Sequence, residues 1–466
     1  MQILEIAALV TRELSPLGAL AVIAVAVGVF MTPASRQSQD DSGRGRYARR
    51  LFTPRRRIKE GSQFAGLLGA LEYRGAKGGL ELGRIGSLPI KLFARDSVIV
   101  FGPTQSYKTS RLVIPAINTF RGAVIATSVK DDIVTATLAT RGSSSALIFD
   151  PYRVSDYANC YWNPICSAMS KEVSRRLAST ICAPINSTPA NEESAFWYAL
   201  AARLLDPMLL AASLLAGDLR LVMDWVELRD FTKAAEALEV AGYHRSRNAL
   251  LASLDREERQ LSSVITTLER SLEPFLHGTA AVEGWRNAAD FAPHEGATLY
   301  LVAPPNRQDE AGPVFGALLR LQLDAAFAEQ PSTGLLLVLD EAANIAPLAN
   351  LDELVSVIAS YRIQMMTIFQ DFSQVRARYG ERASTVVNNH RAKLFLGAIS
   401  DPETIYLAET LCGAAMPNYT AGTFASRSYN EALLPRGGLR GLAPGEGLLI
   451  YGHRSPALLH LRAPHA

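Results

Sequence analysis

Residues 97–112, SVIVFGPTQSYKTSRL, constrain what this 466-residue chain can fold into more than any other stretch does. The residues VIVF are apolar and mostly β-branched, which favours a short buried strand. A loop rich in turn-forming residues follows and leads into a segment that favours a helix. Strand, loop and helix with Gly, Lys and Thr at these spacings are typical of a phosphate loop, G-x-x-x-x-G-K-[ST]. The stretch therefore predicts a nucleotide-phosphate site.

The predicted loop consists of Gly102, Pro103, Thr104, Gln105, Ser106, Tyr107, Lys108 and Thr109. Its backbone N–H groups, at the start of a helix, suit a polyphosphate. Lys108 adds a charge at the outer phosphates, and the hydroxyl of Thr109 can hold Mg²⁺. Tyr107 stands where the second glycine belongs, and a positive φ there would cost about 1–2 kcal/mol. We therefore expect weakened or partner-dependent nucleotide binding.

A second constellation follows a predicted buried strand at residues 335–339, which ends in two acids, Asp340 and Glu341. A phosphate loop needs such a partner, in which Asp340 coordinates Mg²⁺ and Glu341 polarises the attacking water. Gln370 follows the predicted strand 365–369 and can sense the γ-phosphate through its amide. The alternative interpretation is a pair of solvated acids and an ordinary polar residue at two strand ends.

Further buried strands are predicted at residues 98–101, 123–127, 146–149, 297–302 and 393–396, with helical stretches between them. This alternation predicts an α/β fold with a mostly parallel sheet. A small β-rich lead-in precedes it, with a strand near residues 91–93. Pro115 should kink or end the helix over residues 110–120. Residues 166–295 favour helices, including one long helix over residues 245–272 with heptad-like apolar spacing.

Charge is unevenly distributed along the chain, although its net value is only +2. Residues 1–60 hold ten Lys and Arg against five Asp and Glu, whereas the rest holds 37 against 40. The body therefore shows no global basic signal for nucleic acid, and any such surface must be local. The four cysteines lack metal-ligand spacing, so reduced, buried thiols are expected.

The N-terminal region contains an uncharged run, residues 14–35, around the apolar segment LGALAVIAVAVGVFM. Its length suits one tilted membrane crossing, and the arginines that follow predict a cytoplasmic C-terminal side. The alternatives are a buried core helix and a signal peptide. A signal peptide begins with a basic segment, whereas the residues before this run include the acids Glu5 and Glu13. The arginine-rich linker after the run can also contact anionic lipid.

Five motifs in order resemble the type IV secretion coupling proteins, a family of TraG-like ATPases. They are the GPTQSYKTS loop, SVKDD (residues 128–132), FDP (149–151), WNP (162–164) and DEAANIAPL (340–348). SVKDD departs from the family's D-P-K-G-E-like element, because the first acid and the glycine are absent. The resemblance implies a RecA-like P-loop ATPase fold, interrupted by an all-α domain and preceded by one transmembrane helix. The expected divisions are a membrane anchor (1–35), a basic linker (36–62), a first nucleotide-binding half (63–165), an all-α insertion (166–295) and a second half (296–466).

The resemblance also implies a membrane-anchored hexamer that uses ATP and Mg²⁺ to move DNA, single- or double-stranded and without sequence preference. A relaxase or other secreted cargo, channel proteins and lipid are the further expected partners, with most of the chain on the cytoplasmic side of the inner membrane. Arg362 and Arg391 are the candidates for an arginine that reaches a neighbouring subunit's phosphate. Two alternatives stay open: a cargo receptor that binds nucleotide weakly, and a DNA translocase of the FtsK or HerA kind.

Overall fold

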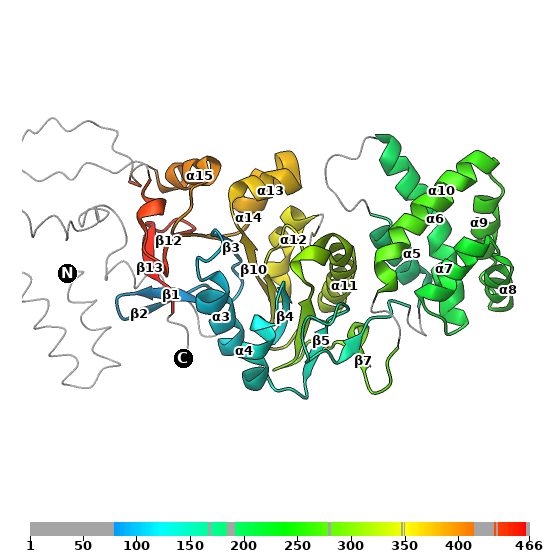
Figure 1. Ribbon diagram of the computed structural model, residues 1–466, viewed down its shortest axis with the longest axis horizontal. Coiled ribbons are helices and arrows are strands. Elements are labelled where there is room, and N and C mark those ends of the chain that lie inside the picture. The colour runs from blue at the N-terminus through cyan, green and yellow to red at the C-terminus, as the bar shows by residue number, and fades with distance from the viewer. Residues whose placement is uncertain are drawn as a thin grey trace, which may run out of the picture. The chain divides into compact units, whose positions relative to one another are not determined.

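The computed structural model describes residues 79–165, 169–183, 192–277, 281–345, 348, 350–413, 433–434 and 437–462. The predicted membrane helix and basic linker lie outside these residues. The described strands are β1 (Glu81–Ile85), β2 (Leu88–Lys91), β3 (Val98–Phe101), β4 (Ala123–Ser128), β5 (Ala146–Phe149), β6 (Cys160–Tyr161), β7 (Arg286–Asn287), β8 (Thr298–Val302), β9 (Leu335–Leu339), β10 (Ile363–Phe369), β11 (Ala392–Leu396), β12 (Glu446–Tyr451) and β13 (Ala457–His460). They form one sheet in the order β2-β1-β13-β12-β11-β3-β10-β9-β4-β8-β5-β6-β7 (Figure 1).

The centre of the sheet is parallel and fully buried, as the apolar strands predict. Strands β3, β4, β5, β8, β9 and β10 have every residue buried, which is typical of a parallel sheet covered on both faces. Strand β3 pairs in parallel with β10 on one side and with β11 on the other. Strand β9 lies between β10 and β4, again in parallel. The carboxyl ends of these central strands therefore meet at one edge.

The other end of the sheet is antiparallel and contains the lead-in strands. Strands β12 and β13 extend the sheet from β11, and β1 and β2 follow as a hairpin at its edge. The sequence placed a strand near residues 91–93, but the structure ends β2 at Lys91. Pro89 lies within β2, and an edge strand tolerates a proline because it need not donate on its free side.

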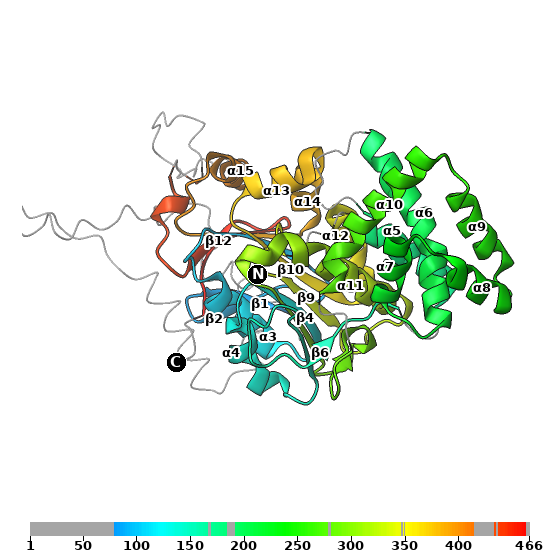
Figure 2. The same cartoon turned by 45° about the vertical axis from the view of Figure 1, so that its right-hand side comes forward.

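Helices cover both faces of the sheet (Figure 2). The described α-helices of the body are α3 (Ile114–Thr119), α4 (Asp132–Arg141), α11 (Gln308–Ala328), α12 (Leu351–Val357), α13 (Phe372–Tyr379), α14 (Ala383–Asn389) and α15 (Pro402–Cys412). Alternate residues of β3 point to opposite faces. Val98 and Val100 pack in the same core as residues of α3 and α4, whereas Ile99 and Phe101 share a core with residues of α11 to α15.

Between β6 and β7 the described residues form six α-helices that pack mainly on one another. They are α5 (Lys171–Ile181), α6 (Glu192–Leu214), α7 (Leu219–Leu228), α8 (Thr232–Val240), α9 (His244–Leu254) and α10 (Glu258–Leu272). The single long helix predicted over residues 245–272 is wrong, because the chain breaks after Leu254. Asp255 ends α9 and Glu257 adopts an extended conformation before α10. The apolar spacing continues across the break, which is why periodicity concealed it.

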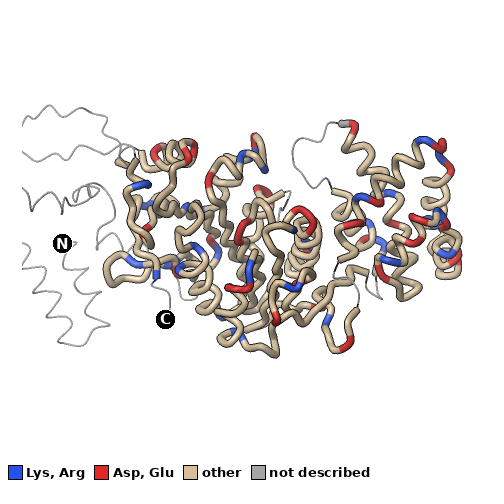
Figure 3. The backbone as a smooth tube through the Cα atoms, in the orientation of Figure 1, with Lys and Arg blue, Asp and Glu red and all other residues tan. Residues whose placement is uncertain are grey.

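Helix α6 is the one helix in the described part of the chain that is long and apolar enough to cross a membrane. Its residues Leu204, Leu205, Met208 and Leu209 are fully buried, and α6 contacts α5 and α7 to α10. Burial within this helical segment thus accounts for its apolar character. Acidic and basic residues are interspersed along α5 to α10 (Figure 3).

Three cysteines, Cys160, Cys182 and Cys412, are buried free thiols, as expected. Burial raises the pKa of each to about 12, so these thiols are unreactive. Cys166 lies outside the described residues.

Candidate nucleotide-binding site

The residues predicted to bind nucleotide converge at the carboxyl edge of the central strands. The phosphate loop, residues 102–109, follows β3. Asp340 and Glu341 follow β9, and Gln370 follows β10. Since β10 lies between β3 and β9, the three groups are neighbours in the sheet. Ligands of open α/β sheets bind at this edge.

The phosphate loop turns through two left-handed residues, Gln105 with φ 62° and Tyr107 with φ 64°. Such a conformation aims successive backbone N–H groups at one point and forms an anion-binding concavity. Ser106 supports the turn, because its hydroxyl donates a 2.7 Å hydrogen bond to the carbonyl of Pro103. Gly102 is required, since a Cβ there would lie 2.8 Å from Oγ of Ser106. The loop thus takes the phosphate-binding shape without its second glycine.

Tyr107 accepts the positive φ that the motif assigns to glycine, at a cost of about 1–2 kcal/mol. Its ring does not fill the loop, which is occupied by Lys108. The guanidinium of Arg111 lies 4.7 Å from the ring centroid, one helical turn further along. The residue is 44% exposed. The tyrosine therefore changes the outer wall of the loop rather than its centre.

The helix after the loop begins with a π-helical turn, Thr109–Val113, and continues as α3. Pro115 lies near the start of α3 and does not end the helix, which runs to Thr119. The wide turn accommodates the missing proline N–H, and such turns are frequent at functional sites.

Lys108 is buried and folds back onto the loop. Its Nζ donates to the carbonyl of Gly102 at 2.5 Å and to that of Pro103 at 3.0 Å. Burial lowers its pKa, whereas the nearby carboxylates of Glu341 and Asp340 oppose this shift. The ammonium group is thus held inside the loop, where a phosphate can replace the two carbonyls as its partner.

Thr109 and Asp340 are joined directly. The Thr109 hydroxyl donates a 3.1 Å hydrogen bond to Oδ2 of Asp340, and the Thr127 hydroxyl donates to the backbone carbonyl of Asp340 at 3.0 Å. Asp340 is only 5% exposed. Burial and then the negative charge of Glu341 raise its pKa to about 6. A hydroxyl and a carboxylate oxygen side by side fit Mg²⁺, which prefers hard oxygen ligands.

Glu341 stands at the end of β9 in a left-handed conformation, with φ 55°. Its carboxylate accepts a long hydrogen bond from Nε2 of Gln370, at 3.4 Å. The backbone N–H of Gln370 donates to Oε1 of Gln374 at 2.9 Å, which fixes the start of the following helix. An acid in a strained backbone beside an amide suits a group that orients a water molecule.

Sequence reasoning missed two contributors to the site. Thr127, a buried polar residue at the end of β4, supports the backbone of Asp340. Asp132, within the SVKDD segment, accepts a 3.3 Å hydrogen bond from the Ser128 hydroxyl and raises the pKa of Asp340 by its charge. For Thr127, the only signal in the sequence was a threonine within an otherwise apolar predicted strand.

Arg362 and Arg391 lie at the opposite edge of the sheet from this chain's own phosphate loop. Arg362 immediately precedes β10 and donates to the carbonyl of Ser332 at 3.0 Å. Arg391 immediately precedes β11, and its Nε lies 3.7 Å from Oδ2 of Asp96. A role for either toward a neighbouring subunit stays a prediction.

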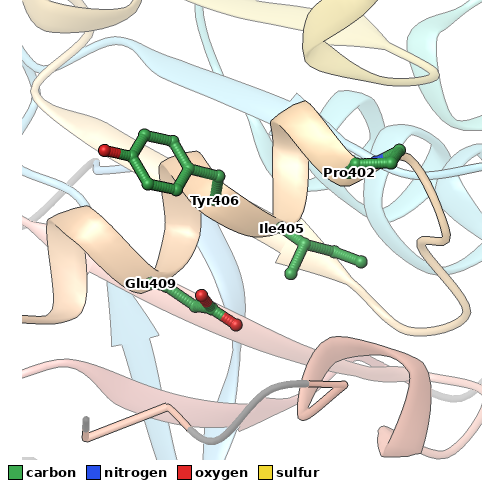
Figure 4. Close-up of a pocket in the computed structure, with 4 residues that line it drawn as sticks. All are labelled: Pro402, Ile405, Tyr406 and Glu409. Atoms are coloured by element: carbon green, nitrogen blue, oxygen red, sulfur yellow. The ribbon is translucent and has the colours of Figure 1, made fainter.

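A separate pocket of about 390 Å³ is lined by residues of α15 (Figure 4). Its lining residues are Pro402, Ile405, Tyr406 and Glu409. The pocket is mainly apolar and contains none of the predicted site residues, so it takes no part in the nucleotide site.

Comparison with known proteins identifies relatives of the chain. The family described as "Type IV secretory system Conjugative DNA transfer" matches residues 72–428. Protein VirD4 of Rhizobium rhizogenes is 22% identical over 351 residues, which cover 72% of this chain and 51% of that protein. The conjugal transfer protein TraG of Escherichia coli is 22% identical over 338 residues, which cover 63% and 52%. The chain spans about half the length of these curated relatives.

Among solved structures, the bacterial conjugative coupling protein TrwBdeltaN70 in complex with sulphate has a TM-score of 0.66 at 18% identity, covering 88% of this chain and 96% of that chain. TrwB in complex with ADP and Mg²⁺ also has a TM-score of 0.66, at 17% identity, covering 87% and 95%. At such identity the likeness shows a shared fold. Since the family matches well over half of the sequence, the chain belongs to the type IV secretory system conjugative DNA transfer family.

Proposed function

We propose that this chain is a coupling protein that hydrolyses ATP to move DNA, alone or with attached protein, into a type IV secretion channel. The convergence of Lys108, Thr109, Asp340, Glu341 and Gln370 at one sheet edge carries the proposal. These residues come from three strands and supply each group that phosphoryl transfer to water needs. TrwB, which shares this fold, has been solved in complex with ADP and Mg²⁺, and this supports ATP and Mg²⁺ as the ligands.

Each residue has a separate role. Lys108 exchanges its loop carbonyls for the β- and γ-phosphates and balances their charge. Thr109 and ionised Asp340 are the residues that hold Mg²⁺, which supplies charge neutralisation at the phosphates. Glu341 accepts a hydrogen bond from the attacking water and orients it. Gln370, which contacts Glu341, responds to the presence of the γ-phosphate.

The proposal extends to location and partners. The uncharged run at residues 14–35, followed by arginines, supports one membrane crossing with the body in the cytoplasm. Family membership supports DNA, a relaxase or other cargo, and channel proteins as partners. A ring of six copies, with Arg362 or Arg391 reaching a neighbour's nucleotide, is the assembly that we infer for such a motor.

The test is Mg²⁺-dependent ATP hydrolysis by the full chain in detergent, with Lys108→Ala and Glu341→Gln as variants. We expect Lys108→Ala to lose ATP binding and Glu341→Gln to bind ATP but turn over at least about a hundredfold more slowly. Lys233→Ala is the matched control, because Lys233 is exposed on α8. Equal rates for the wild type, both site variants and the control would exclude an ATPase at this site.

A second candidate is a cargo receptor that binds nucleotide weakly, and the strained backbone of Tyr107 is the observation that favours it. A receptor of this kind would retain cargo binding with no measurable ATP binding by calorimetry. Tyr107→Gly would then raise ATP affinity by relieving the strain. If Tyr107→Gly leaves the affinity unchanged, the tyrosine is no obstacle to the nucleotide.

A further inference from the structure

Arg111 is a cation beside the phosphate loop that the roles above leave unused. It has no ion pair or side-chain hydrogen bond with any residue that the structure describes, and its Nε is buried without a partner. A buried N–H group without a partner is costly, so native proteins rarely leave one. Arg111 lies three residues after Lys108, on the first turn of the helix that leaves the loop. The location suggests a partner that comes from outside the chain.

The guanidinium of Arg111 lies close to both Tyr107 and Gly445. The ring centroid of Tyr107 is 4.7 Å away. A Cβ at Gly445 would lie 2.2 Å from Nη1 of Arg111, and Gly445 has φ +86°. The carbonyl of Gly445 in turn accepts a 2.7 Å hydrogen bond from the N–H of Leu461. The glycine therefore leaves room for Arg111, and the backbone behind it is anchored in the sheet.

The ring of Tyr107 contacts Arg111 and also has an exposed part that a ligand can contact. Its ring has the cation of Arg111 against it, while 44% of the residue remains exposed. A left-handed tyrosine is unfavourable where glycine would cost nothing. An exposed aromatic ring provides a flat apolar surface that can contact a ribose or stack on a base.

We propose that Arg111 and Tyr107 form the subsite for the nucleoside part of the bound nucleotide. In this arrangement, the N–H groups of Arg111 donate to the α-phosphate, and the Tyr107 ring contacts the nucleoside. Lys108, Thr109 and Asp340 already account for the outer phosphates and the metal. The remaining parts of a nucleoside triphosphate are the α-phosphate, the sugar and the base. The Arg111 cation suits the phosphate, and the Tyr107 ring suits the sugar or base. The inference rests on the proposed nucleotide site and specifies which part of the nucleotide each of the two residues contacts.

The test compares ATP with inorganic pyrophosphate, which has the two outer phosphates but neither the α-phosphate nor the nucleoside. Binding of each to the full chain is measured by calorimetry with Mg²⁺ present, for the wild type, Arg111→Ala, Arg111→Gln and Tyr107→Leu. We expect Arg111→Ala to weaken ATP binding about tenfold or more, while pyrophosphate binding changes less than about twofold. Arg111→Gln keeps part of the side-chain bulk and should lose nearly as much, and Tyr107→Leu should lose about threefold to tenfold for ATP alone.

Arg121→Ala is the matched control, because Arg121 is exposed beyond the far end of α3 and should change neither affinity. The thermal midpoint of each variant shows whether the fold is intact, and Arg111→Gln serves if Arg111→Ala unfolds. Parallel losses for ATP and pyrophosphate, or no loss for either, would overturn the subsite. If the wild type binds both ligands equally well, the proposed subsite is excluded, whereas the phosphate-binding role of the loop is not. A wild type that binds neither ligand overturns the proposed function itself.

Discussion

The hydroxyl of Thr109 lies 3.1 Å from Oδ2 of Asp340, although 231 positions separate the two residues in the chain. The contact joins the start of the loop helix to the end of β9 across the intervening strand β10. A second threonine, Thr127, holds the backbone of Asp340 from the other side, through β4. The sheet therefore positions the two oxygens that we propose as metal ligands, and each contact can be tested by substitution.

Substitution of Thr109 should raise the Mg²⁺ concentration that the protein requires. Thr109→Val removes the hydroxyl but keeps the shape, so we expect half-saturation by Mg²⁺ to rise about tenfold or more. Thr109→Ser restores the oxygen and should stay within about threefold of the wild type. A Mg²⁺ titration of ATP binding or hydrolysis provides the measurement. A Thr109→Val curve that overlies the wild type would exclude Thr109 as a metal ligand.

Asp340 should make the metal-free protein less stable at neutral pH. Its pKa is about 6 in the folded chain, against an ordinary value of 3.8, chiefly because it is buried. The folded state therefore binds a proton more tightly than the unfolded state, and the stability from this group is lost as pH rises through about 6. We expect Asp340→Asn without Mg²⁺ to be more stable than the wild type by on the order of 2 kcal/mol at pH 8.

The gain from Asp340→Asn should vanish as pH falls toward about 4, where the wild-type carboxyl is neutral. Urea unfolding at several pH values in EDTA tests this. A variant that is less stable than the wild type at pH 8 would show that Asp340 is not a destabilising buried charge. Ionised Asp340 is also the form that binds metal, so Mg²⁺ affinity of the wild type should fall on acidification below pH 6.

His390 should show the opposite dependence on pH. It is fully buried, its Nδ1 donates to the carbonyl of Val386 at 2.7 Å, and its Nε2 accepts from the Thr367 hydroxyl at 2.9 Å. Burial lowers its pKa from 6.5 to about 4. The unfolded state then binds the proton first, so stability from this group is lost as pH falls from about 6.5 to about 4.

We expect His390→Gln to cost about 1–3 kcal/mol at pH 8, because it breaks a fitted pair of hydrogen bonds. The cost should shrink on acidification, since only the wild type pays for protonation. Unfolding in urea at pH 8 and pH 5 measures both values. An equal or larger cost at pH 5 would contradict the neutral, buried histidine.

Arg141 should be among the residues that stabilise the fold most. The guanidinium is buried at the end of α4, and its Nε donates to Oγ1 of Thr298 at 2.8 Å. Nη2 donates to the carbonyls of Gly122 and Ala297, at 2.7 and 3.2 Å. Arg141→Met leaves these acceptors without a donor, so we expect a loss of about 3–5 kcal/mol. Arg121→Ala, on the surface nearby, should lie within about 0.5 kcal/mol of the wild type.

The sequence indicated which candidate residues lie near one another, because each follows an apolar strand. Asp340 and Gln370 stand directly after β9 and β10, the loop that holds Lys108 follows β3, and parallel strands bring such ends together. The sheet was predicted from continuous apolar runs, and the helical segment from its helical apolar spacing. The break between α9 and α10 left none, because three charged residues at a helix junction resemble a solvated helix face.

Arg111 and Gly445 show what a sequence pattern does not contain. They lie more than 300 positions apart, and nothing in either neighbourhood indicates the other. Arg111 also lies 4.7 Å from the ring centroid of Tyr107. From the sequence alone, the tyrosine could be interpreted only as a defect in the loop motif, whereas in the folded protein its ring rests on the helix.

Gln370 should control catalysis more than binding. Its Nε2 lies 3.4 Å from Oε2 of Glu341, and its own backbone is held by Gln374. We expect Gln370→Ala to lower kcat about tenfold or more while ATP affinity changes less than about threefold, because a group that orients water acts mainly in the transition state. Gln370→Glu should lose more, since a second carboxylate beside Glu341 repels it. Steady-state kinetics with and without DNA, and calorimetry for ATP, separate the two quantities.

Thr404→Val is the companion to the Gln370 variants. The N–H of Phe372, two residues after Gln370, donates to Oγ1 of Thr404 at 2.7 Å, which links the sensing strand to α15. Thr404 hydrogen-bonds to Phe372 and Asp401 and, among the described residues, to none of the proposed site residues. Thr404→Val should therefore keep the kcat measured without DNA but lose part of its stimulation by DNA. If Gln370→Ala weakens ATP binding as much as it slows turnover, Gln370 is a binding residue. If Thr404→Val retains full stimulation, the link between β10 and α15 does not transmit the signal.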